Sequence, residues 1–240
     1  MHYYNIINKN PLPEFDWGWM TNGDSHSDYH KHTMYDEIFV QRLYEKFFEV
    51  EEGDIVLDVG ASVGPFTYSI LDKKPKHVFC VEPSESEFTI LIKNTLGHPV
   101  THINKGLSNI NGVIEHDKLF GGETQMESMT FDRLIKLYGL NQIDFIKTDC
   151  EGGEYEMFKL ENLPFIKQNV KKIVGEWHLR TPEHKIEFRN FRDKILTQFD
   201  RYEIFSVDGV DIKWDLWNEH FIEYYSEVII YIDNRKTVED

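Results

Sequence analysis

The sequence of 240 residues contains few cysteines, a deficit of basic residues and no long apolar run. Its two cysteines, Cys80 and Cys150, do not have the spacing of a disulfide framework or a metal knuckle, so we expect reduced thiols and a cytoplasmic location. The 26 lysines and arginines against 42 aspartates and glutamates give a net charge of −16, which argues against nucleic acid and anionic membranes as partners. No stretch reaches the roughly 18 apolar residues of a membrane span, and the amino-terminal residues lack the pattern of a secretory signal. We therefore expect no membrane partner.

The sequence does contain an alternation of short apolar runs with segments of helical spacing. The runs are rich in β-branched residues and lie at 55–59, 77–82, 100–104, 143–149 and 171–177. Between them, apolar residues recur at helical spacing, for example in 66–71 and 88–96. Such alternation predicts βαβ units, and therefore an α/β protein of three layers, a mostly parallel sheet between two layers of helices.

Several segments fall outside this alternation. Residues 1–34 are rich in aromatic residues, Asn and Pro without a regular period, and we expect an irregular extension or lid. Apolar residues at helical spacing from Tyr35 to Phe48 predict a helix before the first strand. Residues 109–116 suggest a hairpin. The runs 202–207 and 227–232 have no long helix between them, which predicts an antiparallel last strand.

The most informative motif is a glycine-containing turn at residues 56–66, VLDVGASVGPF. A buried strand ends with Asp58, and Gly60 and Gly64 precede a helix. Glycine lets a ligand approach the backbone, the start of a helix offers free N–H groups, and open α/β sheets bind ligands at this edge. The turn therefore predicts a nucleotide-like ligand, and a tight strand-to-helix turn without a ligand is the alternative.

Glu82 ends the next apolar run, about 20 residues after the glycine turn. At this interval doubly wound folds place an acid that accepts hydrogen bonds from ribose hydroxyls, and a solvated strand-end acid is the alternative. Ser62 occupies the position of the middle glycine of the dinucleotide fingerprint, and Asp58 would repel a pyrophosphate. A ligand with an amine and a sulfonium fits better, which favours S-adenosylmethionine over NAD.

A third motif, FIKTDCEGGEYEMF at residues 145–158, joins a strand to a helix. Strand alternation places Lys147 and Asp149 on one face, so the buried lysine needs a carboxylate partner, for which Asp149 and Asp58 are candidates. Glu154 falls in the first turn of the following helix, where the helix dipole favours an acid. A structural role for Glu154 therefore competes with a catalytic one.

A weaker signal is the sequence GEWH at residues 175–178, at the end of the next run. Alternation puts Glu176 and His178 on one face, beside Asp149 if the two strands are neighbours. An acid and a histidine at this edge can serve as a proton acceptor and its orienting partner. An ordinary strand-end histidine is the alternative.

Together these motifs resemble the class I S-adenosylmethionine-dependent methyltransferases of the FkbM type. The resemblance rests on the turn from Asp58 to Gly64, on Glu82 with Pro83, and on the distinctive stretch from Lys147 to Glu154. The preceding stretch 123–147 also resembles the family's lead-in to its fourth strand. The match covers residues 50–180, and we expect residues 35–240 to form a single methyltransferase domain.

The resemblance implies a seven-stranded sheet in the order 3-2-1-4-5-7-6 with an antiparallel last strand, and O-methylation of a hydroxyl on a sugar, a glycan or another small metabolite. It implies that the glycine turn holds the methionine part of the cofactor, that Glu82 holds the ribose, and that residues 106–108 approach the adenine. Asp149 would lie near the amino group and the transferred methyl. The implied cofactor residues are Asp58, Gly60, Ala61, Ser62, Gly64, Glu82, Pro83, Leu107, Ser108 and Asp149.

General-base help is expected, because an alkyl hydroxyl is too weak an acid to lose its proton beforehand. His178 is the first candidate base and Asp149 the second. Glu151 and Glu154 would orient either one or bind the acceptor, and Lys147 completes the predicted catalytic set. A nicotinamide-dependent oxidoreductase and a non-catalytic S-adenosylmethionine-binding protein are the alternative functions.

A cluster of histidines lies near the amino terminus, at His26, His30 and His32, with Asp28 between them. These residue types, with His178 as a further candidate, suit a divalent metal, which some O-methyltransferases use to acidify the acceptor hydroxyl. Spacing alone favours a solvated polar loop. We therefore expect no metal ligands in this sequence.

Overall fold

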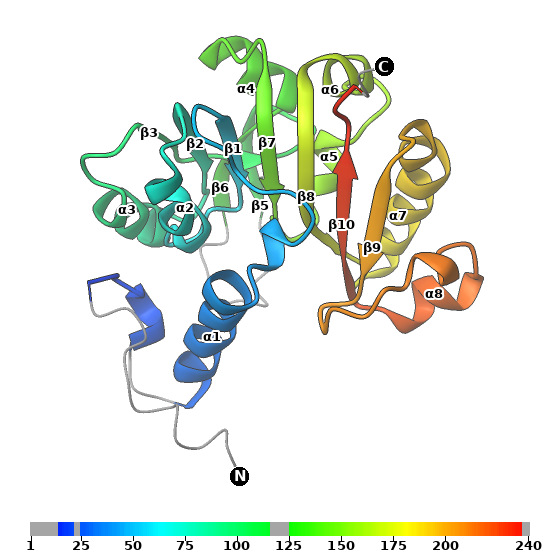
Figure 1. The fold of residues 1–240 in the computed structure, drawn as a ribbon, viewed down its shortest axis with the longest axis horizontal. Coiled ribbons are helices and arrows are strands. Elements are labelled where there is room, and N and C mark those ends of the chain that lie inside the picture. The colour runs from blue at the N-terminus through cyan, green and yellow to red at the C-terminus, as the bar shows by residue number, and fades with distance from the viewer. Residues whose placement is uncertain (1–13, 22–24, 116–124, 237–240) are drawn as a thin grey trace.

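The computed structural model describes residues 14–21, 25–115 and 125–236, and its centre is a seven-stranded sheet (Figure 1). The strands lie in the order β3-β2-β1-β7-β8-β10-β9, and β10 is antiparallel to both of its neighbours. Numbered along the chain within this sheet, the order is the predicted 3-2-1-4-5-7-6, so the fold and the antiparallel last strand are confirmed. The bounds are β1 Ile55–Val59, β2 His77–Val81, β3 Val100–Ile103, β7 Ile143–Thr148, β8 Val170–His178, β9 Tyr202–Phe205 and β10 Glu227–Asp233.

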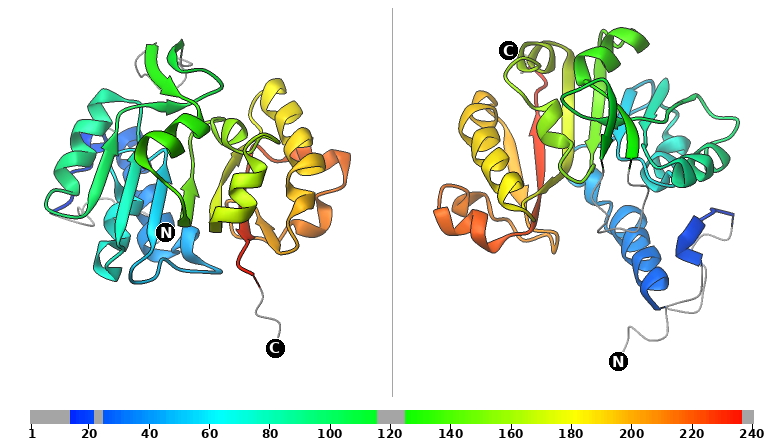
Figure 2. Two further views of the ribbon diagram at one scale, coloured as in Figure 1. Left: turned by 90° about the horizontal axis from the view of Figure 1, so that it is seen from above. Right: turned by 180° about the vertical axis from the view of Figure 1, so that it is seen from behind.

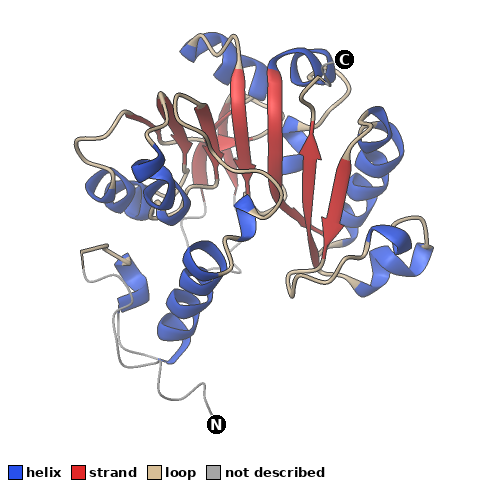
Figure 3. Ribbon diagram, viewed as in Figure 1, coloured by secondary structure: helices blue, strands red, loops and turns tan. Residues whose placement is uncertain are grey.

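Helices cover both faces of the sheet (Figure 3), because the strands carry apolar side chains on both sides. On one face, Val56, Phe145 and Val174 pack under α2 (Pro65–Ile70) and α3 (Glu85–Asn94). On the other face, which Figure 2 shows from behind, Leu57 and Ile173 belong to a second core. The helices that contribute to this second core are α4 Phe131–Tyr138, α5 Glu154–Met157, α6 Leu163–Asn169, α7 Pro182–Lys194 and α8 Glu219–Tyr224.

The amino-terminal part is more regular than the sequence predicts. Within residues 1–34, where we expected irregular chain, a short 3-10 helix covers Gly18–Thr21 and α1 covers Ser25–Tyr35. Trp17 is fully buried beside Val63 of the glycine turn, which shows that apolar packing, rather than sequence periodicity, orders this part. The predictions for residues 1–13 lie outside the described residues.

The single helix predicted from Tyr35 to Phe48 is wrong. The chain forms a π-helical turn at Asp36–Val40, takes a left-handed conformation at Arg42 (φ +52°), and forms a 3-10 turn at Leu43–Glu45. The buried carboxylate of Glu45 accepts hydrogen bonds from the Val50 N–H at 2.8 Å and from Lys73 Nζ at 2.6 Å. These tertiary contacts hold the chain in tight turns that periodicity does not reveal.

The hairpin suggested for residues 109–116 is also placed incorrectly. Gly112–Glu115 forms one strand, β5, which pairs antiparallel with β6 (Gln125–Met129) across residues 116–124, which lie outside the described part. Gly106–Leu107 forms β4 and pairs parallel with β6, so these strands make a second, small sheet. None of the helices in the described ranges is long and apolar enough to cross a membrane.

Candidate active site

The glycine turn between β1 and α2 is held in left-handed conformations at Gly60 (φ +73°), Ser62 (φ +50°) and Gly64 (φ +91°). Gly60 lies against the end of β7, since a Cβ at this position would fall 1.7 Å from the carbonyl oxygen of Asp149. The N–H groups of Gly60 and Ala61 both donate to the last residue of β2. The turn is therefore fixed by its own chain, and Gly60 is required by a close contact between two strand ends as well as by its backbone conformation.

Glu82 follows β2 and turns its carboxylate toward the same turn. One oxygen, Oε2, accepts from the Ser62 N–H at 2.8 Å, and the other, Oε1, accepts from the Ser84 N–H at 2.8 Å. Burial, followed by the charge of Glu87, raises the pKa of Glu82 to about 8. Each oxygen accepts one backbone hydrogen bond, and an ionised carboxylate can accept about four, so both oxygens keep capacity for further donors.

The predicted adenine segment lies at the same edge of the sheet. A Cβ on Gly106 would lie 3.7 Å from the Cβ of Pro83, and a Cβ on Gly153 would lie 3.2 Å from the carbonyl oxygen of Leu107. The Ser108 hydroxyl is engaged inside the small sheet, where it lies 3.2 Å from the hydroxyl of Ser128. The structure thus brings Leu107 to the predicted edge and gives the Ser108 side chain a local partner.

Asp58 and Lys147 form a buried pair beneath the glycine turn. Asp58 Oδ2 accepts from the Thr67 hydroxyl at 2.7 Å, and Asp58 Oδ1 lies 3.4 Å from Lys147 Nζ. Lys147 Nζ also donates to the carbonyl of Gly60 at 2.7 Å and lies 4.0 Å from Asp149 Oδ2. Lys147 therefore finds both of the carboxylate partners predicted for it, and its contacts tie the turn to the ends of β1 and β7.

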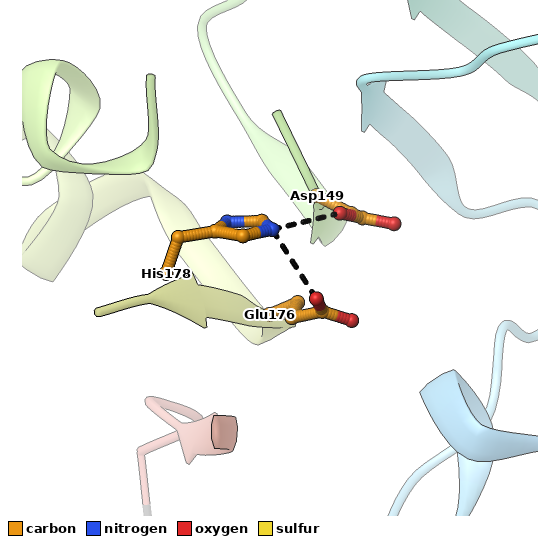
Figure 4. A group of neighbouring side chains, drawn as sticks. All are labelled: Asp149, Glu176 and His178. Atoms are coloured by element: carbon orange, nitrogen blue, oxygen red, sulfur yellow. Dashed lines mark ion pairs between the residues drawn. The ribbon is translucent and has the colours of Figure 1, made fainter. Parts of the chain in front are cut away.

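Asp149, Glu176 and His178 form a compact group at the carboxyl ends of β7 and β8 (Figure 4). The Nε2 atom of His178 lies 3.9 Å from Asp149 Oδ1 and 3.2 Å from Glu176 Oε1. The His178 side chain is fully buried, whereas 31% of the Asp149 side chain and 15% of the Glu176 side chain are exposed. We call these three residues the acid–histidine group. The juxtaposition predicted for neighbouring strands is present.

Glu154 holds the other nitrogen of the His178 ring. Its Oε1 lies 3.1 Å from His178 Nδ1 and accepts from the His178 backbone N–H at 2.9 Å, while its Oε2 accepts from the Gly152 N–H at 2.9 Å. Burial raises the pKa of Glu154, but the positive charge of His178 and these hydrogen bonds bring it below its ordinary value. Burial lowers the pKa of His178, but the charges of Glu154 and Glu176 outweigh this effect and place the pKa well above its ordinary value. Glu154 thus fixes the orientation of the ring.

Two residues of this site come from the amino-terminal part of the chain and were missed from the sequence. The Tyr44 hydroxyl donates to Asp149 Oδ2 at 3.0 Å, and its pKa is raised well above the ordinary value by burial and then by the charge of Asp149. The pKa of Glu37 is raised to about 7 by burial and then by the charges of Glu176 and Asp149. No local pattern signals either residue, because each is more than a hundred positions away from its partners.

Arg180 and Glu227 were also missed, at the outer side of the acid–histidine group. The Arg180 guanidinium donates to Glu151 Oε2 at 2.6 Å, pairs with Glu227, and lies 3.6 Å from Glu176 Oε1. Glu151 itself lies 3.4 Å from His178 Nε2 and has a left-handed backbone (φ +53°). The one sequence signal that could have found Arg180 is its position two residues after GEWH.

The amino-terminal histidines do not converge as metal ligands do. The rings of His26 and His30 meet edge to face on α1, with centroids 4.4 Å apart, and Asp28 pairs with Lys31. Within the described ranges, the one group of three side chains with converging ligand atoms is the acid–histidine group.

Comparison with known proteins identifies this architecture. The family model described as the methyltransferase FkbM domain matches residues 58–203, and no curated protein matches the sequence. Among solved structures, the fibrillarin/Nop5p complex aligns with a TM-score of 0.51 at 15% identity, over 84% of this chain and 82% of that chain. Fibrillarin of Aeropyrum pernix with bound S-adenosyl-L-methionine aligns with a TM-score of 0.47 at 13% identity, over 80% of this chain and 72% of that one. A SAM-dependent methyltransferase of Leishmania major also gives a TM-score of 0.47 at 13% identity, over 89% and 79%. At these identities the solved structures show likeness of fold alone.

Proposed function

Because the chain belongs to the FkbM family of methyltransferases and its cofactor is S-adenosylmethionine, we propose that it methylates a hydroxyl group on a sugar or another small metabolite. The observation that carries this proposal is the contact between the glycine turn and the acid–histidine group. Gly60 packs directly on the carbonyl of Asp149, so a cofactor seated on the turn has these acidic side chains beside it. Side chains that can take a proton or a hydrogen bond from a substrate hydroxyl thus lie where the methyl-accepting substrate must bind.

The residues at this edge fit the cofactor. Glu82 retains acceptor capacity on both carboxylate oxygens for the two ribose hydroxyls, and the half-exposed carboxylate of Asp149 suits an ammonium group. Leu107 lies where the adenine is expected, and the buried Asp58 and Lys147 support the turn from below. When bound, S-adenosylmethionine supplies the methyl group and leaves as a neutral thioether.

We propose that, in the metal-free protein, Glu176 is the general base that removes the proton from the hydroxyl of the methyl acceptor. Burial, followed by the charge of Asp149, raises the pKa of Glu176 to about 7, which matches a general base working near neutral pH. His178, our first candidate from the sequence, carries a proton at neutral pH because its pKa is well above the ordinary value, so its role is to position Glu176 and stabilise charge. Asp149 is the second candidate for the general base, and Glu151 would bind hydroxyl groups of the methyl-accepting substrate.

A small acceptor is favoured over a nucleic acid by the charges of the site. The net charge is −16, and carboxylates crowd the strand ends, so a phosphate backbone would be repelled. Both cysteines are free in the structure, which agrees with the cytoplasmic location that we propose.

The test is methyl transfer to a panel of sugars and polyols, followed as release of S-adenosylhomocysteine, with the product examined by NMR for an O-methyl group. Glu176→Gln should lower kcat by about 10²- to 10⁴-fold, the usual contribution of a general base, without changing the Kd for S-adenosylmethionine measured by calorimetry. Glu223→Gln on α8 is the matched control, because it removes one exposed carboxylate that pairs with Lys185 and Arg189 instead of with the acid–histidine group, and it should transfer normally. Methylation of nitrogen or carbon would refute the O-methyltransferase proposal, and cofactor binding without any transfer would favour the non-catalytic alternative.

A further inference from the structure

The imidazole of His178 has one nitrogen without a hydrogen bond. Its Nε2 atom is buried and has no hydrogen-bond partner among the residues that the structure describes. Glu176 Oε1 at 3.2 Å and Glu151 Oε2 at 3.4 Å lie within ion-pair distance of it, without the geometry of a hydrogen bond. Figure 4 shows this nitrogen pointing between the carboxylates of Asp149 and Glu176. A buried nitrogen that faces carboxylates in this way can hold either a proton or a metal ion, and the two compete for the same position.

The opposite nitrogen is held as it is in known metal sites. Nδ1 lies 3.1 Å from the fully buried carboxylate of Glu154, so the proton on Nδ1 is engaged there. A metal ion that displaces the other proton of the ring would bind the lone pair of Nε2. A ligating histidine almost always donates its other N–H to a carboxylate or carbonyl, which fixes the tautomer and increases the basicity of the ligating nitrogen. Glu154 provides this support for His178.

The spacing of the three ligand atoms suits one cation. One ligand atom from each of Asp149, Glu176 and His178 lies within 4.8 Å of the other two. In octahedral coordination, two ligand atoms that each lie about 2.1 Å from the same metal ion are about 3.0 Å apart when they subtend a right angle at the ion. They are about 4.2 Å apart when they lie on opposite sides of it. The distances from Nε2, 3.2 and 3.9 Å, fall in this range.

The charges around the group also favour a dication. Among the described residues in and near the group, carboxylates outnumber cations even when His178 is protonated, with Glu37, Asp149, Glu151, Glu154, Glu176 and Glu227 against Lys147, Arg180 and His178. Arg180 is shared between Glu151 and Glu227 and lies 3.6 Å from Glu176 Oε1, so it offsets only part of this charge. Asp149 is partly exposed, which leaves an open side for an entering ion and for a further ligand.

We propose that Asp149, Glu176 and His178 bind one divalent metal ion, for which Mn²⁺ is the best match. Two carboxylates and one imidazole suit Mn²⁺ better than Mg²⁺, which prefers oxygen ligands, and a set of three leaves open coordination positions. The role of the ion rests on the proposed function: an acceptor with two adjacent hydroxyls, or a hydroxyl beside a carbonyl, would bind the open positions. The ion would lower the pKa of the reacting hydroxyl, whose proton passes to solvent water while Glu176 serves as a ligand instead of a base.

The experiment measures Mn²⁺ binding directly, without an acceptor. The full-length protein is stripped with EDTA and titrated with Mn²⁺, and the free ion is followed by its EPR signal. We expect one saturable site per chain, weakened about 10- to 100-fold or more in Glu176→Gln and in Asp149→Asn, and unchanged in Glu223→Gln. Both site variants keep the shape of the side chain, and circular dichroism checks that they fold. Nitrogen hyperfine coupling in the spectrum of the bound ion should report His178.

The outcomes separate the metal from the reaction. Absence of a saturable site, or a site that the Glu176→Gln and Asp149→Asn variants leave intact, overturns the metal proposal. Full methyl transfer in excess EDTA overturns the role of the ion and leaves the proposed function standing. A bound Mn²⁺ with nitrogen coupling in a protein that methylates no hydroxyl supports the site and counts against the proposed function.

Discussion

Replacing Gly60 with alanine would place a methyl group against the backbone at the end of β7. The added Cβ would lie 1.7 Å from the carbonyl oxygen of Asp149 and 3.2 Å from the Cα of Cys150. Because real Cβ atoms keep at least 3.0 Å from such neighbours, the carbonyl or the turn must move by more than an ångström. The change therefore displaces the acid–histidine group relative to the glycine turn.

The loss of folding free energy caused by Gly60→Ala has two parts, and a matched variant separates them. A left-handed backbone costs a residue with a Cβ about 1–2 kcal/mol, and overpacking of a close contact costs about 1–3 kcal/mol more. Gly139, which follows α4, has nearly the same backbone (φ +64°) with no atom within 4 Å of its added Cβ, so Gly139→Ala has only the first cost. For a chain of this size each kcal/mol lowers Tm by about 2–4 °C.

We expect Gly60→Ala to lower Tm by about twice as much as Gly139→Ala and to abolish binding of S-adenosylmethionine, whereas Gly139→Ala binds normally. Thermal unfolding followed by circular dichroism and calorimetric titration with the cofactor measure the two effects. Equal losses of Tm with unchanged cofactor affinity in both variants would show that the contact between the turn and Asp149 is looser than the structure has it, and would refute the reasoning.

Two further predictions concern the groups beneath and beside the turn. Lys147→Met should destabilise the protein by about 3–5 kcal/mol, since it leaves Asp58 buried without a cation. Lys171→Met removes a half-exposed lysine from Asp144, which keeps its hydrogen bonds from the Ile55 N–H and Gln142, and should cost at most about 1 kcal/mol. Urea unfolding compares the two variants, and equal losses would contradict the buried pair. Burial raises the pKa of Glu82 to about 8, and ribose hydroxyls donate to its ionised form, so the affinity for 5′-methylthioadenosine should fall by about tenfold per pH unit below this pKa and stay level above it. This ligand has no group that titrates between about pH 6 and 9, so a change of its affinity with pH reports on the protein. The affinity of Glu82→Gln should not change with pH in this way. A wild-type affinity that is independent of pH would exclude an ionised Glu82 as the group that accepts hydrogen bonds from the ribose hydroxyls.

Features that depend on neighbouring positions in the sequence were predictable. The β-branched runs give the strands within one or two residues, and the parallel order brings Asp58, Glu82, Asp149 and His178 to one edge, because the carboxyl ends of parallel strands meet there. Strand alternation also predicts that Lys147 shares a face with Asp149 and needs a carboxylate.

Features that depend on tertiary packing were not predictable. Tyr44 and Glu37 reach the acid–histidine group from turns whose shape is set by buried contacts such as that of Glu45 with the Val50 N–H. The single helix predicted there had the right apolar spacing, but the left-handed Arg42 interrupts it. Periodicity reports which side chains are buried, and it does not report where the backbone turns to bury them.

Direct contacts join the glycine turn to the acid–histidine group, and these contacts bear on how methyl transfer would be aligned. Gly60 touches the carbonyl of Asp149, the Asp149 N–H donates to the end of β1 at 3.0 Å, and Lys147 contacts Asp58, the Gly60 carbonyl and Asp149 together. In-line displacement is sensitive to position, and a misplacement of about 1 Å can cost about 10²-fold in rate. A turn fixed to the proposed acceptor side by backbone contacts and a buried ion pair would keep this distance without help from the substrate. We therefore attribute to Gly60 and Lys147 the alignment of the two halves of the site, in addition to any contact with the cofactor.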